Sequence, residues 1–295
     1  MKDLVYRLQH AALQGLLRLV ALLPLPLRRR IVGRVAEAVV RFGPLRRRAD
    51  DNLALIWPEK PVAERRAIRN AAARNAGHGL TEIWFNDDFA EEVAGLVPEG
   101  PGLAALRAAR DAGKPAIILS GHFGHWEAIR HVLRREGLET GAIYRPNNNP
   151  YYEPIFRAGI ELGGRPIIPK GREGNREVLR HIRAGGFMAL LPDQHVRSGE
   201  WLTFLGQPAL TSIAAAELAL RYDAPLVPAF APMEDGGLRV VFEAPIARDA
   251  PVRMMQDFND RLSSWVTRHP SQWHWLHRRW KYRPAEKPGR ETALR

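Results

Sequence analysis

The chain has 295 residues, of which 45% are hydrophobic and 26% are charged. This composition excludes a disordered polymer, and the length suffices to bury a core without a disulfide or metal staple. There is no cysteine, which excludes disulfides, Cys-ligated zinc and thiolate chemistry. The net charge of +12 indicates a polyanionic partner, namely nucleic acid, anionic lipid or an acidic protein, unless it serves solubility alone.

Residues 4–23 are mostly Leu, Val and Ala. Their main polar side chains follow helical spacing and share one stripe: Arg7, His10, Gln14 and Arg18. The pattern predicts an amphipathic helix that ends at Pro24 and Pro26. Two arginines argue against a clean membrane span, so we expect the helix to lie in or obliquely at a membrane surface. An amphipathic helix packed on the protein's own core is the alternative.

Two arginine clusters follow this segment, at residues 28–30 and 46–48. Basic runs beside an apolar helix are typical of contact with an anionic leaflet, and they favour the cytoplasmic side. We therefore expect a membrane-anchor helix at 1–27, a single domain at 28–284 and a flexible tail at 285–295.

Two further helices are predicted, at 31–42 and 61–85, before a region where strands and helices alternate. The predicted strands are residues 116–120, 141–144, 187–191, 224–230 and 238–242. The predicted helices between them are residues 126–135, 150–162, 173–184 and 212–222. This alternation predicts an α/β fold with a mostly parallel central sheet flanked by helices.

The most informative segment is residues 120–127, where a buried strand ends and a helix begins. In α/β proteins such turns carry the chemistry. A Glu127 carboxylate on Nδ1 of His122 would fix the tautomer and leave Nε2 free to take a proton from a hydroxyl. This spacing alone is a weak signal, because a capping Glu beside an incidental His gives the same pattern.

Two other chemistries involve the same residues. Ser120 is a candidate nucleophile, but it lacks the Gly-x-Ser-x-Gly turn of serine hydrolases. A metal site is the second alternative, although no known zinc motif has this spacing. Its ligands would be His122, His125, Glu127, Asp193 and His195.

Residues 122–127 resemble the His-x-x-x-x-Glu box of the bacterial late acyltransferases of lipid A biosynthesis. These enzymes are distant relatives of glycerolipid acyltransferases, which carry Asp in place of the Glu. The resemblance covers nearly the whole chain, since seven segments match in order. The other six are residues 51–59, 75–82, 144–150, 191–194, 204–211 and 269–281. One departure is His125, where many members have Asn.

The resemblance implies a glycerolipid-acyltransferase-like fold and direct acyl transfer without a cofactor. Acyl carrier protein would deliver the acyl thioester, and the acceptor would be a hydroxyl of a lipid A precursor. His122 would act as general base and Glu127 would hold its imidazole. Backbone N–H groups near Gly124 are candidate donors to the oxyanion. The enzyme would work at the cytoplasmic face of the bacterial inner membrane.

Candidate substrate-binding residues come from the same segments and from nearby basic positions. Guanidinium groups match phosphates and sugars, which favours the arginines. The full set is Arg145, Asn149, Arg165, Arg172, Asp193 and Gln194. A second group, Trp273, Trp275 and Trp280 with Arg278 and Arg279, is predicted either at the lipid interface or in the core.

Three rival functions differ in their partners. Nucleic-acid binding would explain the charge but not the apolar first helix, and no DNA or RNA motif is visible, so we expect no nucleic-acid partner. A metal-dependent hydrolase would use the His and Glu residues. A transferase acting on another lysolipid or glycolipid is the nearest rival.

Overall fold

The computed structural model describes residues 2–282 and contains a six-stranded sheet flanked by helices. The strands are β1 (Ala116–Leu119), β2 (Thr140–Tyr144), β3 (Ile167–Pro169), β4 (Phe187–Leu190), β7 (Leu226–Phe230) and β10 (Val241–Phe242). Their order is β10-β7-β1-β4-β2-β3, and every neighbouring pair is parallel except β10 with β7. The expected α/β fold with a mostly parallel sheet is confirmed.

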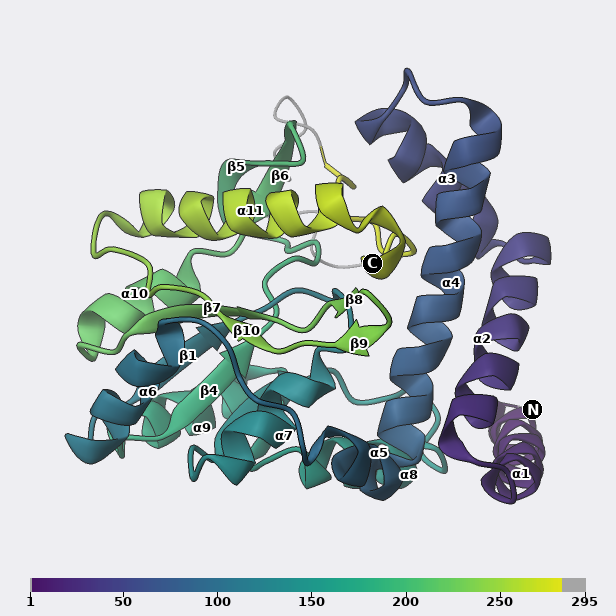
Figure 1. Cartoon of the computed structure of the whole chain (residues 1–295), viewed down its shortest axis with the longest axis horizontal. Helices are drawn as coiled ribbons and strands as arrows, with labels where there is room; N and C mark the ends of the chain where they lie inside the picture. Colours follow the sequence, from purple (N-terminus) through teal and green to yellow (C-terminus); the bar gives the residue numbers. More distant parts are fainter. Residues whose placement is uncertain (1, 283–295) are drawn as a thin grey trace.

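Helices cover both faces of this sheet (Figure 1). They are α5 (Asn86–Val93), α6 (Gly102–Asp111), α7 (Glu127–Arg135), α8 (Glu153–Leu162), α9 (Arg172–Arg183), α10 (Ala214–Arg221) and α11 (Pro251–Arg268). Because strand side chains alternate, Ile117 packs in one core cluster with α9, α10 and α11, whereas Ile118 packs in another with α6 and α7. The central strand β1 is thus buried on both faces, as parallel strands usually are.

Four helices precede the sheet: α1 (Lys2–Ala21), α2 (Leu25–Phe42), α3 (Leu45–Ile56) and α4 (Val62–Trp84). Figure 1 shows α4 standing between the sheet and α2. A Cβ added to Gly77 of α4 would lie 2.8 Å from the Cα of Gly33 in α2. Glycine therefore lets these two helices cross at backbone contact, which places their side chains in fixed relation to the sheet.

The structure differs from the sequence prediction at two places. Pro26 does not end a helix but lies in the first turn of α2, a position where its missing N–H costs nothing. Residues 238–242 are not one strand, because β9 (Gly237–Leu238) pairs with β8 (Met233–Glu234) in a hairpin before β10 begins. Several other elements were not predicted: the hairpin of β5 (Glu200–Phe204) with β6 (Gln207–Thr211), strand β3, helices α3, α5, α6 and α11, and the short helix η1 (Pro270–Gln272).

The tryptophan cluster belongs to the core. Trp273 and Trp275 are almost completely buried and meet edge-to-face, with ring centroids 4.8 Å apart. Arg279 is also buried, and its guanidinium donates to the Leu210 carbonyl and the Thr211 hydroxyl. Trp280 packs partly buried against this core, whereas Arg278 is exposed, so core packing is observed for the tryptophans and Arg279 but not for Arg278.

Within residues 2–282, no helix combines the length and the apolar character needed to cross a bilayer. The first helix forms as predicted, while its role as an anchor stays a prediction. The predicted tail at 285–295 lies outside the described residues.

Acid should destabilise the fold through buried histidines such as His131, which contacts Phe89 edge-on from α7. Burial, followed by Arg130 and Arg134, lowers the pKa of His131 to about 4. The unfolded state therefore binds more protons between pH 4 and 6.5, so stability falls as the pH is lowered through this range. We expect His131→Leu to remove about 2 kcal/mol of the stability loss between about pH 7 and pH 5. Urea unfolding at both pH values measures this difference, and an unchanged pH dependence would contradict it.

Candidate active site

The turn after β1 requires glycine. Gly124 has a φ of +60°, in the left-handed region, and a Cβ there would lie 2.1 Å from the Ala231 carbonyl oxygen. At Gly121 a Cβ would approach the side chains of Leu262 and Asp193. These two glycines let the turn pack tightly between β4, β7 and α11, which directs the His122 side chain toward a cavity at the carboxyl edge of the sheet.

The carboxylate that holds His122 belongs to Asp193, which follows β4. Its Oδ1 lies 2.8 Å from His122 Nδ1, and its Oδ2 accepts the backbone N–H of His122 at 2.8 Å. The indole N–H of Trp273 donates to the same Oδ2 at 2.9 Å. Burial alone would raise the pKa of Asp193, but the neighbouring His122 and these hydrogen bonds lower it to about 2. Asp193 is therefore ionised and fixes Nδ1 of His122 as a donor.

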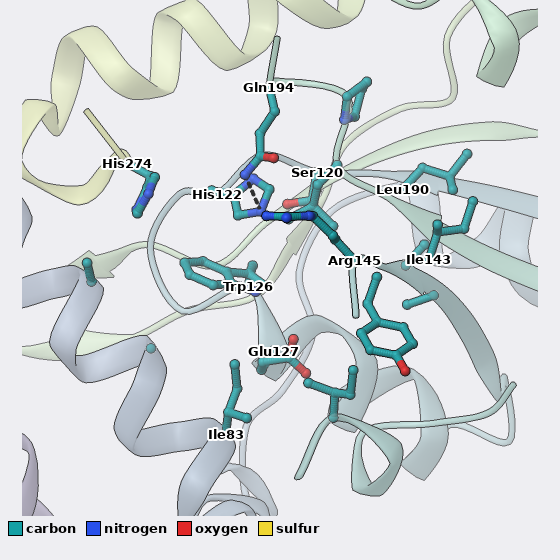
Figure 2. Close-up of a pocket in the computed structure, with 18 of the residues that line it drawn as sticks. Ile83, Ser120, His122, Trp126, Glu127, Ile143, Arg145, Leu190, Gln194 and His274 are labelled. Atoms are coloured by element: carbon teal, nitrogen blue, oxygen red, sulfur yellow. Dashed lines mark hydrogen bonds between the residues drawn. The ribbon is translucent and has the colours of Figure 1, made fainter. Parts of the chain in front are cut away.

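The predicted contact between Glu127 and His122 is absent. Glu127 begins α7 and forms a buried ion pair with Arg130, at 3.2 Å. Figure 2 shows its carboxylate across the Trp126 ring from the His122 imidazole. Glu127 and Arg130 are three positions apart and so share one face of α7, which lets them pair with each other. Burial raises the pKa of Glu127, and Arg130 opposes that effect.

Nε2 of His122 faces the cavity and meets the side-chain amide of Gln194 at 3.1 Å (Figure 2). Since Nδ1 donates to Asp193, Nε2 carries the lone pair and accepts from this amide. The His122 side chain is 25% exposed, so a substrate can reach it. An imidazole held in this way can accept a proton at Nε2 once the Gln194 amide is replaced.

His125, the second imidazole of the turn, belongs to a different cluster. Its Nδ1 forms a short contact with Glu82 of α4, and both side chains are buried. Arg29 of α2 lies 3.5 Å from the same carboxylate. His125 therefore faces away from His122, and the five predicted metal ligands are not brought together. Residues 2–282 contain no group of three or more His, Asp or Glu side chains arranged to hold a metal ion.

The cavity in front of His122 has a volume of about 1330 Å³ and two chemically different walls. Apolar side chains of α2 and α4 form one wall, including Val35, Val39 and Leu80. Polar side chains that follow the strands form the other. They are Arg145 after β2, Lys170 after β3 and Gln194 after β4, with His274 from the C-terminal segment. The cavity can hold a long apolar chain next to a polar headgroup.

Only part of the predicted binding set lines this cavity. Arg145, Asp193 and Gln194 gather around or near His122. The other predicted residues lie elsewhere. Asn149 donates to the backbone carbonyl of Tyr6 in α1, Arg165 pairs with Glu161, and Arg172 is exposed at the start of α9. For these three, a role in substrate binding stays a prediction.

Sequence reasoning missed Lys170 and His274. Lys170 follows a strand of only three residues that ends in Pro169, too short to be recognised by alternation. His274 donates its backbone N–H to the His122 carbonyl, and its ring centroid lies 6.1 Å from that of His122. Burial, with His122 as a smaller cause, lowers the pKa of His274 to about 4, so the ring is neutral at neutral pH.

The model of the family described as bacterial lipid A biosynthesis acyltransferase matches residues 3–282. The match includes every helix and strand that forms the cavity. The chain belongs to this family of acyltransferases.

Individual relatives agree with this assignment. The chain is 28% identical to the lipid A biosynthesis lauroyltransferase of Escherichia coli (strain K12), over 94% of this chain and 92% of the relative. It is 26% identical to the lipid A biosynthesis myristoyltransferase of the same organism, over 92% and 85%. It is 27% identical to a phosphatidylinositol mannoside acyltransferase of Mycobacterium tuberculosis (strain CDC 1551 / Oshkosh), over 61% and 58%.

The geometry of the turn bears on two roles considered from the sequence, the oxyanion donors near Gly124 and the nucleophile Ser120. The backbone N–H of Gly124 donates to the Gln272 carbonyl, and that of His125 donates to Ala231. These two groups are therefore occupied within the fold, and the expectation that N–H groups near Gly124 stabilise an oxyanion stays a prediction. The Ser120 hydroxyl makes only a long contact, 3.5 Å, with the Gly121 carbonyl, and within residues 2–282 it has no hydrogen bond to an imidazole that would activate it.

We expect Asp193→Asn to reduce kcat of the acyltransferase by about 10³- to 10⁴-fold, as loss of the carboxylate does in other imidazole–carboxylate catalysts. An amide presents an N–H where Nδ1 now donates, which favours the tautomer without a lone pair on Nε2. Steady-state kinetics, with melting temperature as the control for folding, measures this effect. Activity near that of the wild type would contradict the role of Asp193.

Glu127→Gln should destabilise the fold through Arg130, because breaking a buried ion pair from one side costs about 3–5 kcal/mol. We expect the double variant Glu127→Gln/Arg130→Met to recover part of that stability, as measured by urea unfolding. If the double variant is stable but still inactive, Glu127 contributes to catalysis beyond its pairing with Arg130. If the single variant is as stable as the wild type, this account of Glu127 is wrong.

Proposed function

We propose that this acyltransferase moves a fatty acyl chain from acyl carrier protein onto a hydroxyl of a lipid A precursor, with His122 as general base. The observation that carries the proposal is the apolar cavity of about 1330 Å³ into which Nε2 of His122 points. An acyl chain and an acceptor hydroxyl can meet at that nitrogen. The family and its lipid A relatives supply the substrate class.

In the proposed step, the acceptor hydroxyl replaces the Gln194 amide at Nε2 of His122. The oxygen attacks the thioester carbonyl as its proton passes to Nε2, and Asp193 stabilises the resulting imidazolium. The carbon–sulfur bond then breaks, and the imidazolium returns the proton to the leaving thiolate. The displaced Gln194 amide is our candidate donor to the tetrahedral oxyanion. Direct transfer of this kind requires no cofactor.

The acceptor's phosphates would contact the polar wall. Arg145 and Lys170 line the cavity, and so does Arg221 of α10. Guanidinium and ammonium groups at the carboxyl edge of a parallel sheet are suited to anionic headgroups. We infer that Arg145 holds a phosphate while Gln194 and Asp193 organise His122.

The lipid would enter from the side of α1 and α2. These helices expose large apolar residues, among them Leu19, Leu22 and Phe42. Three exposed residues, Leu16, Val35 and Val39, also line the cavity, so its mouth is continuous with this apolar surface. We propose that the surface rests on the cytoplasmic face of the inner membrane, with anionic lipid and acidic carrier protein attracted by the net charge of +12.

A second candidate acceptor is another glycolipid or lysolipid. The similarity to the phosphatidylinositol mannoside acyltransferase supports it, because the lipid in that relative's name is not lipid A. The same base and the same acyl pocket would serve either acceptor.

The proposal is tested with purified protein, lauroyl- or myristoyl-carrier protein and a tetra-acylated lipid A precursor, with lipid masses as the readout. We expect a gain of one acyl chain that is abolished by His122→Ala and largely retained by His125→Ala. The latter is the matched control, since it removes an imidazole of the same turn that contacts Glu82 of α4 and not Asp193.

Parallel reactions with phosphatidylinositol mannoside and lysophospholipid decide between the acceptors. Transfer to one of these lipids, with none to the lipid A precursor, would overturn the acceptor but keep the acyltransferase. Transfer that survives His122→Ala would overturn the base.

A further inference from the structure

A second cavity, of about 400 Å³, lies on the other side of the α2–α4 helix pair. We call it the arginine cavity. Its lining is dominated by basic side chains and includes one acidic residue, and it is bounded by Met233 of the β8–β9 hairpin. The lining residues are Pro26, Arg29, Arg30, Arg34, Arg74, His78, Glu92, His125 and Met233. Figure 1 shows this hairpin beside α4.

The helix crossing at Gly33 and Gly77 creates the two cavities. Residues of α2 on one side, such as Val32 and Val35, line the cavity in front of His122, which we call the acyl cavity. Arg30 and Arg34 line the arginine cavity. On α4, Gly77 and Leu80 line the first cavity and Arg74 lines the second. The helix pair is therefore apolar toward one cavity and cationic toward the other.

The arginines have more donor groups than their partners use. Arg34 and Arg74 each place a single nitrogen on the same oxygen of Glu37, at 3.1 and 2.8 Å. Arg29 pairs with Glu92 at 2.6 Å. Arg30 is exposed and has no acidic partner among residues 2–282. Since a guanidinium carries several N–H donors, this cavity presents unfilled donors from more than one arginine.

The lining of the cavity carries four arginines against one glutamate, Glu92. His78 lines it, and its pKa is lowered to about 4 by burial and then by His125, Arg29 and Arg74. The three basic neighbours act on His78 in the same direction, against gaining a further positive charge. The excess of positive charge in the lining attracts an anion. Because its pKa is lowered, His78 is a neutral hydrogen-bond donor at neutral pH.

We propose that the arginine cavity binds a phosphate group, carried by a lipid headgroup or free in solution. Guanidinium forks from Arg30, Arg34 and Arg74 match phosphate oxygens bidentately. The cavity is adjacent to apolar surface, since Pro26 lines it and the next residue, Leu27, is exposed. A lipid could thus place its phosphate among the arginines and its chains against α1 and α2.

This site does not depend on the proposed acyl transfer, because His122 and the acyl cavity lie on the other side of the helix pair. The test therefore measures binding without an acyl donor. Isothermal titration calorimetry on the full-length protein, in about 0.1 M salt, uses three probes: dihexanoyl phosphatidate, dihexanoyl phosphatidylcholine and inorganic phosphate.

The variant is Arg30→Gln/Arg34→Gln, and the matched control is Arg41→Gln/Arg47→Gln. Both pairs remove two charges from exposed helical positions near the N-terminus; Arg34 and Arg47 are 69% and 91% exposed. Arg41 and Arg47 do not line the arginine cavity. We expect saturable phosphatidate binding that weakens about tenfold or more in the first variant and less than about twofold in the control.

Each outcome decides something. Binding of phosphatidate but not of inorganic phosphate supports a lipid headgroup as the ligand, and equal binding of both supports free phosphate. An equal loss in both variants would assign the binding to general surface charge and overturn the proposal. So would wild-type affinity in the cavity variant, or phosphatidylcholine binding as tight as phosphatidate.

Discussion

The buried Asp193 carboxylate is the interaction on which the rest of the site depends. It accepts three N–H groups, two from His122 and one from Trp273, and thereby joins the end of β1, the end of β4 and the C-terminal segment. A buried carboxylate is costly unless its oxygens are paired, and here each oxygen is. One charge thus sets the tautomer of His122 and ties together three parts of the chain that are far apart in sequence.

The sheet and the position of His122 at its edge were predictable because each rests on local pattern. Short apolar runs predict β1, β2 and β4, and side chains that follow parallel strands meet at one edge, which is why His122, Arg145 and Gln194 lie together. The partner of His122 was not predictable from spacing. Glu127 is five residues away but belongs to α7, whereas Asp193 is brought beside His122 only by the pairing of β1 with β4. The Glu82–His125 pair escaped prediction for the same reason, since it joins α4 to the turn.

The helix pair α2–α4 has two chemically different sides. Contact at Gly33 and Gly77 brings the backbones so close that side chains are forced to the two sides. Apolar residues face the cavity in front of His122 and arginines face the second one. A helix that is apolar on one side and basic on the other is suited to the boundary between acyl chains and headgroups.

The contact between Trp273 and Asp193 spans 80 positions, and the backbone of His274 holds the carbonyl of His122. Interactions this distant in sequence form late, after the intervening chain has been made and folded. During synthesis on the ribosome, the sheet and its turn can assemble while Asp193 still lacks its indole partner. The His122–Asp193 pair should therefore acquire its full set of partners only when the last part of the domain has emerged.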